Sequence, residues 1–155
     1  ITPRILSSKP YPSWVVPPST NISIPRNIES LNNKLLIQGS YIDETIIMIY
    51  DPKQEKTIFT KSSAFASASP DGKCFVLGLI SDKHLLFSRD KLKLTLYGSA
   101  TMESRLSFEL KYNPTLSGHD FSVQWSKDSR YALLKTLTSD SSLTLIDTKE
   151  NLIYQ

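Results

Sequence analysis

The chain has 155 residues, of which 39% are hydrophobic and 21% charged, and its formal net charge is +3. This length suits one domain with a buried core, and the scattering of both charge signs argues against a nucleic-acid-binding surface. A single cysteine, Cys74, excludes an internal disulfide framework. The sequence contains no apolar run of signal or transmembrane length.

Residues 1–29 differ from the rest of the chain. Proline fixes φ and cannot donate to a sheet ladder, so this part is predicted to be an extended strap. Tyr11 and Trp14 lie among its prolines and favour packing against the remainder. Because the chain starts at Ile1, it looks processed or excised, and a periplasmic, secreted or cytoplasmic location stays open. Six of the nine prolines fall here: Pro3, Pro10, Pro12, Pro17, Pro18 and Pro25.

A repeated pattern follows the strap. Residues 30–37, 69–76 and 126–133 each run from a serine through a polar turn and a basic residue into an apolar strand. The first and third copies match without a gap as far as Asp51 and Asp147, and Asp90 is predicted to end the equivalent strand of the middle copy. Apolar runs between Asp, Asn and Gly turns predict strands, and any helix should be short. The predicted strands are 34–39, 45–50, 56–60, 74–80, 85–89, 92–97, 105–112, 121–125, 131–137 and 142–147.

Residues 69–73 and 121–131 resemble the turn between the inner strands of β-propeller blades. The resemblance is to the WD40-like and TolB-like kind, which also occurs in the propellers of prolyl-oligopeptidase-type hydrolases. It covers residues 30–155 as about three blades (30–63, 64–120 and 121–155), without the Trp-Asp pair of strict WD40 repeats. It implies an all-β partial or small propeller, with a small open barrel or sandwich as the alternative. Closed propellers take four or more blades, so an incomplete rim is expected.

The middle copy holds additional sequence in which charged and apolar residues alternate. Residues 91–97 and 105–112 flank a loop with Gly98, which predicts an extra half-exposed hairpin. Its outer face carries Lys91, Lys93 and Arg105. Lysines protect an outer strand from edge pairing, and they also suit a docking face for an acidic partner.

Residues suited to catalysis or metal binding are sparse. His84 and His119 have no metal-ligand spacing to each other or to Cys74, and no nucleophile elbow or phosphate loop occurs. Asp51 and Asp147 recur at equivalent strand ends, which marks turn residues rather than catalytic ones. The chain is therefore predicted not to be an enzyme on its own and to hold no cofactor or metal.

The repeat also predicts a core. Replacing Ile47 or Leu133 with alanine is expected to cost about 2–5 kcal/mol, the usual range for such changes in a packed core. The residues predicted to be buried occupy matching apolar positions: Leu35, Ile37, Ile47, Ile49, Phe75, Leu77, Leu86, Leu133, Leu143 and Leu145.

Three function classes follow from the resemblance and the incomplete rim. The first is a non-catalytic protein-interaction module, such as a scaffold or complex subunit, which binds another polypeptide or a second copy. The second is the propeller portion of a larger serine hydrolase, and the third is a bacterial envelope partner or sensor of a membrane regulator. For the first, the strap and the strand at residues 152–154 should contact the partner, because buried aromatics dominate interfaces. The predicted contact residues are Tyr11, Trp14, Tyr154, Lys91, Lys93 and Arg105.

Overall fold

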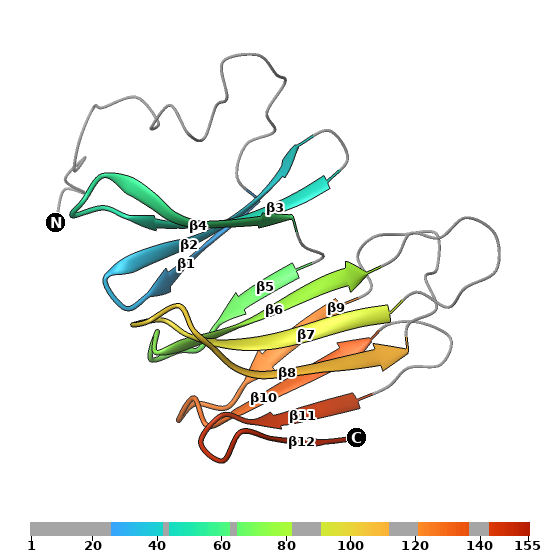
Figure 1. Cartoon of the computed structure of the whole chain (residues 1–155). Coiled ribbons are helices and arrows are strands. Elements are labelled where there is room, and N and C mark those ends of the chain that lie inside the picture. The colour runs from blue at the N-terminus through green and yellow to red at the C-terminus, as the bar shows by residue number, and fades with distance from the viewer. Residues whose placement is uncertain (1–25, 42–43, 63–64, 82–90, 112–120, 137–142) are drawn as a thin grey trace, which may run out of the picture.

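A computed structural model describes residues 26–41, 44–62, 65–81, 91–111, 121–136 and 143–155. In these ranges the chain forms three four-stranded antiparallel sheets, and in each sheet the strands follow in chain order (Figure 1). Sheet 1 contains β1 (Asn27–Leu31), β2 (Lys34–Tyr41), β3 (Glu44–Asp51) and β4 (Lys56–Ser62). Sheet 2 contains β5 (Phe65–Ala68), β6 (Cys74–Ser81), β7 (Lys91–Gly98) and β8 (Ser104–Lys111). Sheet 3 contains β9 (Phe121–Trp125), β10 (Tyr131–Thr136), β11 (Leu143–Asp147) and β12 (Leu152–Tyr154).

We call the first strand of each sheet its inner strand. The predicted all-β fold is confirmed, but the inner strands β1 and β5 were not predicted. Strand β1 is largely polar and exposed, and β5 consists mainly of alanine and serine, so neither carries a strong β signal. Both form because β2 and β6 supply a complete pairing partner. The strand predicted at residues 85–89 lies outside the described ranges, as does nearly all of the strap.

The hairpin predicted as an extra element is part of sheet 2. Strand β6 pairs with β7 from Cys74 opposite Gly98 to Ser81 opposite Lys91, and β8 pairs with the other edge of β7. The two strands are therefore the third and fourth strands of an ordinary sheet. The third strand of sheet 2, which corresponds to β3 and β11, is β7, and it ends at Gly98 rather than at Asp90. Its leucines fill the core between sheets 2 and 3.

The turns repeat more regularly than their sequences. Residues with positive φ recur in the turn after the first strand and in the turn before the fourth strand of every sheet. The matched serines are not all equivalent, however, since Ser30 lies within β1 while Ser69 and Ser126 begin turns. The first sheet closes this turn with two residues, whereas the others use residues 69–73 and 126–130. The positive-φ residues are Asn32, Gly72 and Ser129 in the first set and Glu55, Met102 and Asn151 in the second.

Alternation of side chains gives each sheet two faces, which we call leading, toward the next sheet in chain order, and trailing, toward the previous one. The leading face of sheet 1 packs on the trailing face of sheet 2, and the leading face of sheet 2 packs on the trailing face of sheet 3 (Figure 1). The first contact joins Leu36, Ile47 and Ile49 to Phe75, Leu77 and Tyr97. The second joins Val76, Leu94 and Leu96 to Ala132, Leu134 and Ile146.

Polar contacts accompany both sheet-to-sheet interfaces. The Glu29 carboxylate accepts a hydrogen bond from the Ala68 amide at 2.6 Å, which links the inner strands of sheets 1 and 2. Trp125 Nε1 donates to Ser67 Oγ at 3.0 Å and links the inner strands of sheets 2 and 3. Trp125 also packs against the core cluster between sheets 2 and 3.

Part of the predicted core is wrong, and the errors share one cause. Leu35, Leu133 and Leu145 are half-buried and Leu143 is 57% exposed, while Leu86 lies outside the described part of the chain. Leu133, Leu143 and Leu145 lie on the leading face of sheet 3, and Leu35 lies on the trailing face of sheet 1. Neither of these two end faces packs on another described sheet. The predicted burial is confirmed for Ile37, Ile47, Ile49, Phe75 and Leu77.

Candidate protein interface

The leading face of sheet 3 carries exposed apolar side chains, with the exposed Lys135 and Gln124 beside them. Leu133 pairs with Leu145, which in turn pairs with Tyr154, so β10, β11 and β12 contribute to the same surface. Leu143 is 57% exposed, Leu152 49% and Tyr154 51%. We call this surface the open face and define it by Tyr131, Leu133, Leu143, Leu145, Leu152 and Tyr154.

The same positions are covered in the other sheets. Leu143 lies four residues before the end of β11, and Ile47 and Leu94 hold that place in β3 and β7. Ile47 and Leu94 are both 0% exposed because the next sheet packs on them. The open face therefore repeats the apolar positions of a buried sheet-to-sheet surface, with the exposed Lys135 opposite Leu143. Exposed apolar patches of this kind mark interaction sites.

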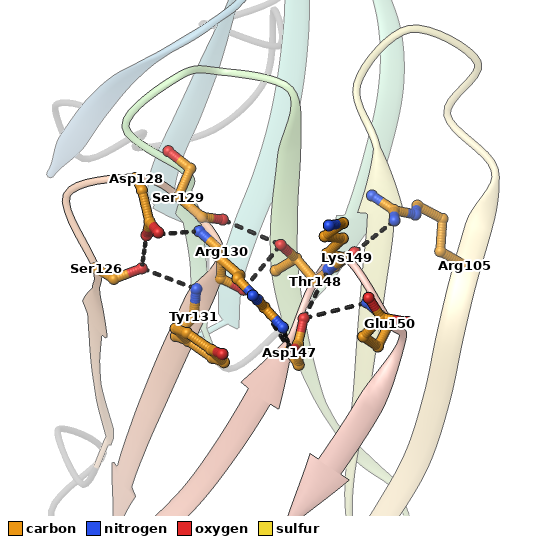
Figure 2. Close-up of polar contacts among 10 residues, drawn as sticks. All are labelled: Arg105, Ser126, Asp128, Ser129, Arg130, Tyr131, Asp147, Thr148, Lys149 and Glu150. Atoms are coloured by element: carbon orange, nitrogen blue, oxygen red, sulfur yellow. Dashed lines mark hydrogen bonds and ion pairs between the residues drawn. The ribbon is translucent and has the colours of Figure 1, made fainter.

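A fixed ion pair borders the open face (Figure 2). Arg130 donates from Nε and Nη2 to Oδ2 of Asp147 at 3.2 and 2.9 Å, and its guanidinium lies 4.9 Å from the centre of the Tyr131 ring. The hydrogen bonds from Arg130 lower the pKa of Asp147. Asp147 Oδ1 accepts the amides of Lys149 and Glu150 at 3.0 and 3.1 Å.

Asp51 makes the same turn contacts in sheet 1. Its Oδ1 accepts the amides of Lys53 and Gln54 at 2.9 and 3.2 Å. The predicted turn role of Asp51 and Asp147 is therefore confirmed.

The ion pair predicts an acid-sensitive contribution to stability. Since the pKa of Asp147 is lowered in the folded chain, its contribution is complete above the unfolded value of about 3.9 and is lost as the pH falls through the folded value. We expect the difference in unfolding free energy between the wild type and Asp147→Asn to be largest near neutral pH and to shrink below about pH 4. Urea unfolding at several pH values measures this. Arg130→Met should flatten the same dependence, and parallel pH curves for the wild type and Asp147→Asn would contradict the assignment.

Hydrogen bonds within sheet 3, and one from a side chain of sheet 2, hold this rim in place. Thr148 donates from its amide to the Arg130 carbonyl at 2.8 Å and from Oγ1 to the Ser129 carbonyl at 3.0 Å. Arg105 Nη2, from the outer strand of sheet 2, donates to the Thr148 carbonyl (Figure 2). The Arg105 guanidinium thus already binds a neighbouring sheet.

The predicted partner-binding residues lie on different surfaces. Tyr154 is on the open face, together with Leu152 of the same predicted contact strand and with Leu143, which the sequence did not single out as a contact residue. Lys91 and Lys93 are exposed on β7 of sheet 2, and Lys91 Nζ lies 3.2 Å from a Glu109 carboxylate oxygen. Tyr11 and Trp14 lie outside the described ranges, so their contact role stays a prediction. Alternating leucines occur on covered and open sheets alike, so no sequence signal could have separated Leu143 from Ile47.

The described ranges hold little that suits chemistry. Within them, no three His, Cys, Asp or Glu side chains gather as metal ligands. Cys74 is buried, and burial raises the pKa of its thiol, which suits a core side chain. His84 and His119 lie outside these ranges. No helix long and apolar enough to span a membrane occurs among the residues that the structure describes.

Comparisons with known proteins support the fold. No protein-family model matches the sequence, and no curated protein gives a significant match. The structure is similar to that of an uncharacterized protein, lmo1340, of Listeria monocytogenes EGD-e, with TM-score 0.58 and 14% identity over 88% of this chain and 40% of that one. It is also similar to the β-propeller domain of the Trilobed protease from Pyrococcus furiosus, which has an open velcro topology, with TM-score 0.59 and 18% identity over 86% of this chain and 41% of that one.

A third similar structure is dihydro-heme d1 dehydrogenase NirN, with TM-score 0.51 and 18% identity over 83% of this chain and 26% of that one. The chain therefore spans less than half the length of the structures it matches. Three antiparallel four-stranded sheets with these neighbours define a partial β-propeller, in which each sheet is one blade.

Proposed function

We propose that the chain is a non-catalytic interaction module that binds another polypeptide through the open face of its third blade. The observation that carries this proposal is the exposure of Leu143, since Ile47 and Leu94 are fully buried at the equivalent positions. Burying apolar surface contributes about 25 cal/mol per Å², so a face of this composition favours a covering partner. Tyr154 adds an aromatic side chain of the kind that dominates binding energy at interfaces.

The short outer strand assists such binding. Strand β12 spans only Leu152–Tyr154, so backbone pairing at this edge is limited, and side chains of the face supply most of the contact. Arg130 and Asp147 neutralise each other at the rim, so the partner meets an apolar centre beside a paired charge.

Site-specific photo-crosslinking in the organism that makes the protein tests the proposal. A photoreactive phenylalanine in place of Leu143 should give a covalent adduct with one polypeptide, which mass spectrometry identifies. The same group in place of Lys53, which is exposed on a turn of the first blade, is the matched control and should give no such adduct. Absence of an adduct at Leu143, with the chain sedimenting as a monomer, would contradict the proposed function.

A second candidate is the propeller portion of a larger peptidase. It is supported by the similarity to the propeller domain of the Trilobed protease and by the short span of this chain relative to that structure. The full-length reading frame tests it. An α/β domain with a serine nucleophile elbow on the same polypeptide would support the peptidase, and its absence would leave the interaction module.

A further inference from the structure

The open face has the apolar positions of a face that receives a blade, with Lys135 in the place of Gly78. On the second blade, Val76 pairs with Leu96, and on the third blade Leu133 pairs with Leu145 at the same place in the register. Leu94 and Leu143 also correspond. On the second blade, Val76, Leu94 and Leu96 pack against the third blade. The corresponding positions of the third blade are all leucine: Leu133, Leu143 and Leu145.

The turn beside this face repeats as well. In the second blade, the Asp71 amide donates to Ser129 Oγ of the third blade at 3.0 Å. Asp128 holds the place of Asp71 in the third blade, because Ser126 and Ser69 begin both turns and each serine donates to the aspartate two residues later. The Asp128 side chain is exposed, as is that of Asp71, so the two turns present matching surfaces on this side.

We propose that the open face is a blade-docking surface and that its occupant is a fourth four-stranded blade. This deepens the proposed function, on which it rests, by naming the kind of polypeptide that binds. The required partner surface is an apolar trailing face like that formed by Ala132, Leu134 and Ile146, which fits the leading face of the second blade. The β-propeller domain of the Trilobed protease, which is similar in structure, also extends well beyond the part that this chain matches.

A second copy of the chain is the competing occupant. To dock head to tail, it would present the trailing face of its first blade. That face carries Ile37, the equivalent of Leu77 and Leu134, which is 5% exposed, and Ile28 opposite it, which is 53% exposed. The propeller domain of the Trilobed protease, of which this chain covers 41%, favours a further blade instead, and the dilution result described below distinguishes the two occupants.

An extended chain tests the proposal. The probe is a second copy of residues 112–155, fused after Gln155 of the full chain. The reporter is the rate at which a maleimide labels the thiol introduced by Leu143→Cys in the original third blade, with the labelled site located by mass spectrometry. We expect the extension to slow this labelling at least tenfold, while a Lys53→Cys reporter on the first blade is unaffected.

Two controls keep the outcome decisive. Replacing Leu134 and Ile146 of the added copy with aspartate should restore fast labelling, because it removes the docking face. A second extension, built from residues 65–111, guards against misfolding of the first, since that blade offers Phe75, Leu77 and Tyr97 as its trailing face.

Unchanged labelling with both extensions would overturn the blade-docking proposal. So would slow labelling of the unextended chain at micromolar concentration that becomes fast on dilution, since the occupant would then be a second copy. Either result leaves the photo-crosslinking at Leu143 to decide the broader proposed function independently.

Discussion

Leu134→Ala should lower the free energy of unfolding by about 2–5 kcal/mol, whereas Leu133→Ala should lower it by about 1 kcal/mol or less. The two residues are adjacent in β10 and have the same side chain, but they point to opposite faces of the third blade. Leu134 is packed between the second and third blades, so its truncation leaves a cavity. Leu133 lies on the open face and remains partly in contact with solvent.

Urea unfolding of both variants at neutral pH measures the difference, with unchanged m-values as the sign that only stability has changed. Ile47→Ala is the matched control in the first blade and should fall in the same range as Leu134→Ala, because Ile47 is fully buried. Equal losses for Leu133→Ala and Leu134→Ala would contradict the assignment of faces. The loss of unfolding free energy that the repeat alone predicts for Leu133→Ala, about 2–5 kcal/mol, is therefore too large.

Gly72→Ala should destabilise the chain by more than about 2 kcal/mol, although it adds only one methyl group. Gly72 has φ +68°, a left-handed conformation that costs other residues about 1–2 kcal/mol. A Cβ at this position would also lie 2.4 Å from the backbone nitrogen of Asn32, in the turn of the first blade. Because that atom is backbone, relief of the clash requires the two turns to separate.

Gly98→Ala is the matched control for this substitution. Its Cβ would meet nothing closer than 3.7 Å, and its φ is not in the left-handed region. We expect it to be neutral or to stabilise the chain by about 0.4–1 kcal/mol, through a smaller loss of unfolded-chain entropy. Thermal and urea unfolding of both variants distinguish the two, and a Gly72→Ala variant as stable as Gly98→Ala would show that the turns of the first two blades do not pack closely.

Local patterns in the sequence predicted most of the blades but assigned some of their strands incorrectly. Apolar runs bounded by polar turns placed β2, β3 and β6 correctly, since strands of this composition suit a packed sheet. The inner strand β5 was missed because Phe65–Ala68 lacks β-branched residues, and it forms only against β6. Strand β7 was taken for an extra hairpin, since sequence spacing does not show which of several strands pairs with β6.

The candidate interface was less accessible to sequence reasoning. Tyr154 was expected to contact a partner, and it does lie on the open face, with its contact role still a prediction. Leu143 was assigned to the core because it matches Ile47 in the repeat. Leu143 does hold the place of Ile47 in its strand. It is exposed because no described blade packs on the leading face of the third one.

The sequence by itself determined the all-β class, the repeat, and the turns closed by Asp51 and Asp147, because these depend on contacts within a few residues along the chain. The tertiary structure alone decided which face of each blade is covered. A period of two places apolar side chains on both faces of a strand, and burial then depends on whether another blade stands opposite. For this reason Ile47 and Leu143 share a place in the repeat, yet one lies in the core and the other on an open surface.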